Sequence, residues 1–414
     1  MKNSLRLALG KIKNITEDQT HLDLSKMGVG ELDIPAVVEA LQEHPNIVSL
    51  NLSNNEIGDV GAQTLSSITH LTALYLSCNE VGNEGLKALS GLTKLKALDI
   101  SHNSFRDEGL QYIATLPELI TLKLSGHDIT FVGAQHLSHC TSLKSLDWPS
   151  CRIGDEGAEA ISQLTNLVSL SLDLSEDAKL GLWPSNDNGY IHDEGATALS
   201  KLTKLKSLNL GGNRIHAAGV QALSGLKNLT SLGLAYNQIQ DGGAKALSKI
   251  PNLITLDLEF NDITDKGVKA ISGYKNLVTL NLGRNKIGDA GAKTLSALTN
   301  LVSLNLEWNK IGNDGAQALS KFPKLLSLNL DTNEIGVEGA KALSTLPKLV
   351  HLDILGNPGI TKLLFDQRKV LDEIDAPVMA RARLIGDSEA VGNYIRSEIT
   401  KANMAAAKAW RPML

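Results

Sequence analysis

Four side chains recur at one position of a repeating pattern and could form a recognition surface. Tyr236, Phe260, Arg284 and Trp308 are each 24 residues apart, and each directly precedes an asparagine. Tyr, Trp and Arg are enriched at the energetic centres of protein interfaces, and a guanidinium group can stack on an aromatic ring. We therefore expect a partner-binding strip, with Arg284 stacked on Phe260 or Trp308. The alternative is that these side chains only cover the edge of a sheet.

Acidic residues surround the strip at alternating positions that are expected to face solvent. Only Lys123 and Arg284 oppose them at equivalent positions. A surface of one charge sign steers partners of the opposite sign, so we expect a partner protein with a basic patch. Ordinary surface charge is the other explanation. The acidic residues are Asp257, Glu259, Glu307, Asp331 and Asp353, with Asp99, Asp147 and Asp173 earlier in the chain.

Histidines and cysteines gather within two adjacent repeats and raise the question of a metal site or a thiol nucleophile. They are His127, His136, His139, Cys140 and Cys151. His127 and Cys151 stand at a position that the repeat buries, whereas the other three lie on or after a helix on the opposite side. We therefore predict no catalytic residue, no metal and no cofactor, and a protein that is not an enzyme.

The element that positions these residues is a module of 24 residues, seen most clearly at 299–322, TNLVSLNLEWNKIGNDGAQALSKF. Its leucines alternate with polar residues around Leu304 and Leu306, which predicts a short strand with one buried face. Ala316, Leu319 and Phe322 then recur at helical spacing. The module matches the L-x-x-L-x-L-x-x-N-x-L pattern of leucine-rich repeats and predicts a strand, a turn and a helix.

About thirteen such modules cover residues 45–357, and one module cannot bury its own apolar edge. The sequence therefore predicts an α/β solenoid, a horseshoe with a parallel sheet on its concave face and helices on its convex face. Residues 1–44 are expected to form an N-terminal cap, and residues 358–414 a helical C-terminal cap. The modules begin at Pro45, Thr69, Thr93, Pro117, Thr141, Thr165, Thr203, Lys227, Pro251, Lys275, Thr299, Pro323 and Pro347.

Polar residues at fixed positions of the module have predicted structural roles. A buried asparagine such as Asn309 is expected to bond to backbone groups of its own and the neighbouring turn. An aspartate or asparagine at the start of each helix, such as Asp59 or Asp289, is expected to cap the first-turn amides of that helix.

One repeat is longer than the others, with an insertion near residues 173–188 that contains Trp183. Loops inserted at one rim of a solenoid are common binding elements. Trp183 therefore either folds down on the repeats or contacts a partner.

Composition limits the function classes. The balance of 40 basic and 45 acidic residues gives no basic footprint for nucleic acid. Three cysteines form no disulfide framework, and no apolar stretch approaches membrane length. The N-terminal apolar run is too short for a signal peptide. We expect a monomer without membrane contact, either cytoplasmic or secreted into a host cell without an N-terminal signal peptide.

The consensus LxxLxSLNLxxNxIGDEGAxALSxL resembles the GALA-type repeats of bacterial effector proteins, which are related to the ribonuclease-inhibitor-like class. The resemblance implies a non-catalytic protein-interaction module and the role of a bacterial effector. Effectors of that kind often pair their repeats with an F-box, which implies, as an alternative, an adaptor that presents targets to a ubiquitin ligase. Residues 1–44 are too short for a convincing F-box.

A second resemblance lies near the C-terminus, where ARARLIGDSEAVGNY (380–394) is similar to the opening strand and phosphate loop of Roc GTPase domains. It departs from that pattern at Gly386 and Gly392, which are one residue too far apart. Asn393 and Tyr394 also replace the Lys and Ser/Thr that hold phosphate and magnesium. A degenerate Roc-like fragment is therefore a further alternative.

The predicted site combines the strip, its acidic neighbours and the insertion. We expect one partner protein to bind the concave face. The predicted partner-binding residues are Tyr236, Asp257, Glu259, Phe260, Arg284, Glu307, Trp308, Asp331 and Trp183.

Overall fold

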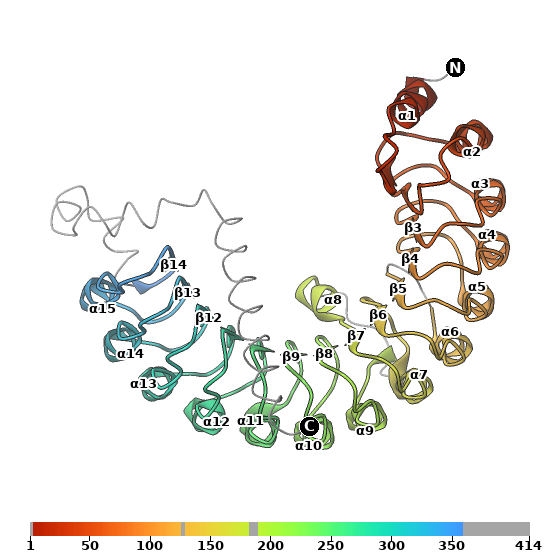
Figure 1. The fold of residues 1–414 in the computed structure, drawn as a ribbon. Helices are drawn as coiled ribbons and strands as arrows, with labels where there is room; N and C mark the ends of the chain where they lie inside the picture. The colour runs from red at the N-terminus through yellow and green to blue at the C-terminus, as the bar shows by residue number, and fades with distance from the viewer. Residues whose placement is uncertain (1–2, 126–128, 182–188, 359–414) are drawn as a thin grey trace, which may run out of the picture. The chain divides into compact units, whose positions relative to one another are not determined.

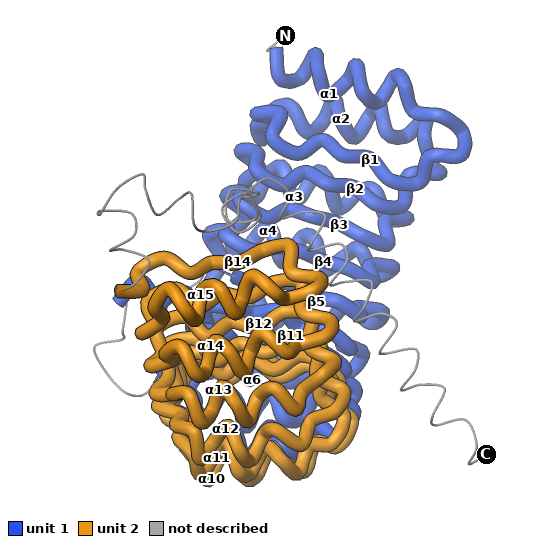
Figure 2. Tube along the Cα trace, turned by 90° about the vertical axis from the view of Figure 1, so that its left-hand side faces the viewer, with its two compact units in different colours: residues 1–205 blue, residues 206–414 orange. Residues whose placement is uncertain are grey.

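The computed structural model describes residues 3–125, 129–181 and 189–358. The chain divides into two compact units, residues 1–205 and 206–414 (Figure 2). In each unit short strands alternate with helices along the chain, and the repeat helices line one side of the strands (Figure 1). No described helix is both long and apolar enough to cross a membrane.

The strands of the first unit pair in chain order, and these pairs are parallel. They are β1 (His21–Asp23), β2 (Ser49–Asn51), β3 (Ala73–Tyr75), β4 (Ala97–Asp99), β5 (Thr121–Lys123), β6 (Ser145–Asp147) and β7 (Ser169–Ser171). The helical elements are α1 (Asn3–Lys13), η1 (Glu31–Asp33), α2 (Ile34–Leu41), α3 (Asp59–Leu65), α4 (Asn83–Leu89), α5 (Asp107–Ile113), α6 (Phe131–Leu137), α7 (Gly154–Ile161), α8 (Ser175–Lys179) and α9 (Asp193–Leu199).

The second unit repeats this arrangement with parallel strands, again in chain order. They are β8 (Ser207–Asn209), β9 (Ser231–Gly233), β10 (Thr255–Asp257), β11 (Thr279–Asn281), β12 (Ser303–Asn305), β13 (Ser327–Asn329) and β14 (His351–Asp353). The helices are α10 (Ala217–Leu223), α11 (Gln240–Leu247), α12 (Asp265–Ile271), α13 (Asp289–Leu295), α14 (Asn313–Leu319) and α15 (Val337–Leu343).

The core of each unit lies between its strands and its helices and consists mainly of leucine. The central residue of each strand is a leucine in register with the next, as Leu280 is with Leu304 and Leu304 with Leu328. These side chains are buried, together with the leucines and small residues on the inner side of each helix. Since each repeat buries its apolar edge only against its neighbours, stacking supplies the stability. Trp148 takes a leucine position in β6's repeat and is fully buried.

The repeated asparagine connects neighbouring turns, as the sequence predicted. Asn309 Nδ2 donates to the carbonyl oxygens of Leu306 (3.1 Å) and Leu282 (2.9 Å). Its Oδ1 accepts from the backbone N–H of Ile287 at 3.0 Å. The same pattern at Asn285 and Asn333 satisfies buried backbone groups that would otherwise be costly.

The predicted capping of each helix by its own aspartate is wrong. Asp289 is the first residue of α13, whose N-cap is Gly288 without a side-chain bond. Asp289 Oδ1 instead accepts from the backbone N–H groups of Gly312 (2.7 Å) and Gly315 (2.8 Å), at the start of α14. The carboxylate lies beside the next repeat because it belongs to the helix and not to the preceding turn. Asp59, Asp107, Asp155, Asp241 and Asn313 do the same.

The insertion contributes α8 to the first unit. Asp177 of α8 accepts from Ser150 Oγ at 3.2 Å and lies 3.8 Å from Arg152 Nη2. Trp183, the residues from 359 onward and the Roc-like stretch 380–394 lie outside the described residues.

Candidate functional site

The residue before each repeat asparagine adopts a left-handed backbone conformation. At the non-glycine positions φ lies between +52° and +58°, and Gly212 and Gly356 adopt the same conformation. A left-handed residue with a side chain costs about 1 kcal/mol relative to glycine. The column positions are Asn54, Cys78, His102, Ser150, Tyr236, Phe260, Arg284, Trp308 and Thr332.

Four consecutive positions of this column carry the large side chains of the predicted strip. The backbone holds each in place, because its N–H donates to a carbonyl oxygen of the next repeat, as Trp308 does to Asp331 at 2.8 Å. Residues such as Asn54 and Cys78 share this backbone conformation, so the strip is distinguished by the size of its side chains and not by its backbone.

The four side chains form two stacked pairs. The rings of Tyr236 and Phe260 lie 5.0 Å apart between centroids, with 14° between their planes. Arg284 Cζ lies 5.3 Å from the centroid of the Trp308 ring, a cation–π arrangement. Phe260 is 50% exposed and Trp308 53% exposed, whereas Tyr236 is only 8% exposed. The strip thus presents two rings to solvent and uses Tyr236 as support.

Glu259 lies beneath this stack and is only 7% exposed. Its Oε1 accepts from Tyr236 Oη at 3.0 Å and lies 3.4 Å from Arg284 Nε, and its Oε2 accepts from Asn281 Nδ2 at 3.2 Å. Burial and the negative charge of Glu259 raise the pKa of Tyr236, so Tyr236 stays a hydrogen-bond donor. The prediction that Glu259 faces solvent is wrong, because the side chains of two neighbouring repeats close over it.

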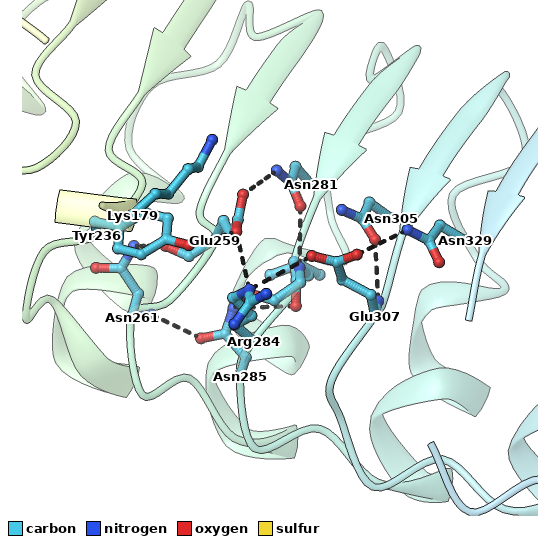
Figure 3. A network of polar contacts seen from close by, with 12 residues as sticks. Lys179, Tyr236, Glu259, Asn261, Asn281, Arg284, Asn285, Asn305, Glu307 and Asn329 are labelled. Atoms are coloured by element: carbon cyan, nitrogen blue, oxygen red, sulfur yellow. Dashed lines mark hydrogen bonds and ion pairs between the residues drawn. The ribbon is translucent and has the colours of Figure 1, made fainter. Parts of the chain in front are cut away.

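Glu307 holds Arg284 from the other side. Arg284 Nε lies 3.5 Å from Glu307 Oε1, and Asn329 Nδ2 donates to Glu307 Oε2 at 3.0 Å (Figure 3). Gly283, between the two glutamates, leaves the necessary space, since a Cβ there would lie 3.0 Å from Glu307 Cγ and 3.1 Å from Asn305 Nδ2. The guanidinium group is therefore positioned by a pair of carboxylates before any partner arrives.

The remaining acidic residues of this face differ in their surroundings. Asp257 Oδ1 accepts from the backbone N–H of Glu259 at 3.0 Å. Asp331 Oδ1 accepts from the backbone N–H of Leu355 at 2.6 Å, and Asp353 pairs with His351 at 2.8 Å. Burial, followed by the charges of Asp353 and Glu307, raises the pKa of Asp331 above its ordinary value. This end of the face carries an excess of negative charge.

Sequence reasoning missed the amide residues that organise the glutamates. Asn281 and Asn329 each donate to a glutamate from the adjacent strand position, and their own Oδ1 atoms accept from Gly283 N and Asp331 N at 3.0 Å. The signal was present in the sequence, since Asn or Asp is the last residue of every strand from β10 to β14. Gly283 was also recognisable in the sequence, because it stands at the repeat position that Glu259 and Glu307 occupy in the two neighbouring repeats.

The cysteine and histidine cluster does not form a site in the described part of the chain. Cys140 and Cys151 are buried, while His136 lies on α6 and His139 follows it. Burial raises the pKa of the Cys151 thiol far above its ordinary value, so it is not an activated nucleophile. Among the described residues, no three His, Cys, Asp or Glu side chains are placed to hold a metal ion. His127 lies outside those residues.

Comparison with known families supports the repeat pattern. A leucine-rich-repeat model matches residues 45–105, 187–239, 203–263 and 251–311, and a second leucine-rich-repeat model matches 139–162 and 323–344. The chain is a leucine-rich-repeat protein. The predicted α/β solenoid with a parallel sheet is thereby confirmed. Repeats of this family are typically non-catalytic modules that bind proteins.

Among solved structures, this leucine-rich-repeat protein is similar to an internalin from Listeria monocytogenes. The two are 25% identical, and the match has a TM-score of 0.62 and covers 85% of this chain and 95% of the internalin chain. A comparison with curated proteins finds no match.

Proposed function

We propose that the protein is a non-catalytic binding module that docks one partner protein on the sheet face of its second unit. The observation that carries the proposal is the pair of half-exposed rings, Phe260 and Trp308, held in a left-handed column by stacking on Tyr236 and Arg284. A rigid aromatic surface loses little conformational entropy on binding, so more of the contact energy appears as affinity.

The surrounding charges support a partner with a basic patch. The face carries Asp257, Glu259, Glu307, Asp331 and Asp353, and Arg284 is occupied by two of them. The net negative charge would attract a basic surface and orient it across the strip. A monomeric module and a role as a bacterial effector, which the repeat consensus suggests, are finer parts of this proposal.

The test is a double substitution of the exposed rings, Phe260→Ala with Trp308→Ala. After a partner has been captured and purified, titration calorimetry should show a Kd increase of at least about 30-fold, since hot-spot side chains contribute about 2 kcal/mol or more. The matched control is Asn54→Ala with His102→Ala, which alters the same left-handed column in the first unit. Equal affinity of the ring variant and the control would rule out the strip as the docking site.

A further inference from the structure

The acidic face of the second unit fits a basic segment, and the chain itself contains one. Residues 390–414 carry four basic side chains and a single acidic one, Glu398. This stretch lies outside the described residues. Its basic residues are Arg396, Lys401, Lys408 and Arg411, and its larger apolar residues include Ile395, Ile399 and Trp410.

We infer that residues 390–414 bind the sheet face of their own unit and compete there with the partner protein. The inference rests on the proposed function, because the segment has the charge expected of the partner. It adds a regulatory step: the partner must displace a basic segment that is already attached to the receptor.

The charges of the face favour such an occupant. Glu259 and Glu307 share the guanidinium group of Arg284, and Asp353 pairs with His351. Asp331 accepts from the backbone N–H of Leu355 through Oδ1, so Oδ2 can accept from a cation. Burial, followed by the negative charges of Asp353 and Glu307, raises the pKa of Asp331. A lysine or arginine placed beside Asp331 would favour its charged form.

The exposed rings favour an occupant that also carries apolar groups. Phe260 and Trp308 offer two aromatic faces next to these carboxylates, and such patches are usually covered by a partner or by the protein itself. A segment that combines Arg396, Lys401 and Lys408 with Ile395 and Ile399 matches both kinds of surface.

The chain is long enough to make this contact. The 31 residues from 359 to 389 connect the last described residue to the segment. Fully extended, they would span roughly 100 Å. Strand β14 is four strand spacings from β10, or about 19 Å. Attachment also gives the segment an effective concentration on the order of millimolar, so even weak contacts would keep the face occupied.

Zero-length cross-linking of the full chain at low concentration tests the contact directly. A carbodiimide joins a carboxylate only to an amine that touches it, and peptide mapping identifies the pair. We expect Lys401 or Lys408 to be joined to Asp257, Asp331 or Asp353 in the monomeric fraction, with a yield that falls as salt rises. A Lys401→Arg, Lys408→Arg variant keeps the charge and should lose these cross-links. Joining of these lysines only to other surfaces, or only between two copies, would overturn the inference.

Competition is tested with Arg396→Glu, Lys401→Glu, Lys408→Glu and Arg411→Glu combined. Freed of its internal occupant, this variant should bind the purified partner at least about 10-fold more tightly. The matched control reverses charge on the helix side, with Lys245→Glu, Lys269→Glu and Lys293→Glu, and should change the affinity much less. Unchanged affinity of the tail variant would overturn the competition even if the cross-links form. Failure of the ring variant to lose the partner would overturn the proposed function alone, because the cross-links need no partner.

Discussion

Individual residues of the second unit's sheet face have separate electrostatic roles. Glu259 and Glu307 are balanced by Arg284, and amide groups from Asn281 and Asn329 complete their hydrogen bonding. Within the described residues, no cation forms an ion pair with Asp331. One face therefore combines a neutralised part, which positions the rings, with a negatively charged part that can attract a cation.

This difference predicts that Asp331→Asn stabilises the folded protein at neutral pH. The pKa of Asp331 is raised on folding, so the folded state binds a proton more readily than the unfolded chain. The ionised carboxylate of Asp331 therefore lowers the free energy of unfolding at pH values above its folded-state pKa. This destabilisation disappears below its ordinary pKa of about 3.8. Asparagine keeps the oxygen that accepts from Leu355 N–H. The urea midpoint of the variant should exceed that of the parent at pH 7, and the difference should vanish near pH 3.

The control for this measurement is Asp99→Asn on the sheet face of the first unit. Asp99 lies in register with Tyr75 and Lys123, so no neighbouring carboxylate is relieved there. If Asp99→Asn raised the urea midpoint as much as Asp331→Asn does, a general loss of negative charge would explain the effect. The burial of Asp331 and its neighbouring carboxylates would then not be the cause.

The site could be predicted from sequence only where one repeat position determined the outcome. The spacing of Phe260 and Trp308 indicated one column, and the structure places both there with exposed rings. The burial of Glu259 could not be predicted in this way, because it depends on side chains from both neighbouring repeats. The left-handed backbone was also absent from the pattern, since residues as different as Asn54 and Trp308 adopt it.

At the scale of elements, the strands followed from the 24-residue period, whereas the helix starts depend on the preceding repeat. Where that repeat has Asp or Asn at its first helical residue, the next helix begins at the usual position. The first helical residue is instead Phe131 in α6 and Ala217 in α10. The helices that follow these two, α7 and α11, begin one residue earlier than usual, at Gly154 and Gln240. Both of these residues have positive φ, so a different turn replaces the missing side-chain acceptor.

The element scale predicts that Asp289→Ala weakens the start of α14. The change removes two hydrogen bonds to Gly312 N–H and Gly315 N–H, together with a negative charge near a helix N-terminus. We expect a loss of about 1 to 2 kcal/mol in the free energy of unfolding, the usual cost of losing a cap. Amide hydrogen exchange should increase at Gly312 and Gly315 first. Asp289→Asn should be much milder, because Asn313 makes the equivalent bonds to the next repeat. An equally large loss for both variants would contradict this account.

At the scale of the whole molecule, charge is distributed unevenly along the chain. Residues 1–205 carry 15 basic and 26 acidic side chains, a net charge of −11, whereas residues 206–414 carry 25 basic and 19 acidic side chains, a net charge of +6. Within the second unit, the acidic strip neighbours are therefore a local exception to a basic background. The overall net charge of −5 conceals this pattern.

That local exception predicts that association with a basic partner depends on salt mainly through its on-rate. Long-range attraction is screened within about 8 Å at physiological ionic strength, whereas packing against Phe260 and Trp308 is not. Between about 20 and 500 mM salt, stopped-flow measurements should show the on-rate falling by about tenfold or more, with little change in the off-rate. Asp257→Asn with Asp353→Asn should flatten this dependence, whereas Phe260→Ala should raise the off-rate and leave the salt slope unchanged. If the on-rate were insensitive to salt, the partner would have to be selected by its apolar surface alone, and the basic patch would no longer be part of the proposal.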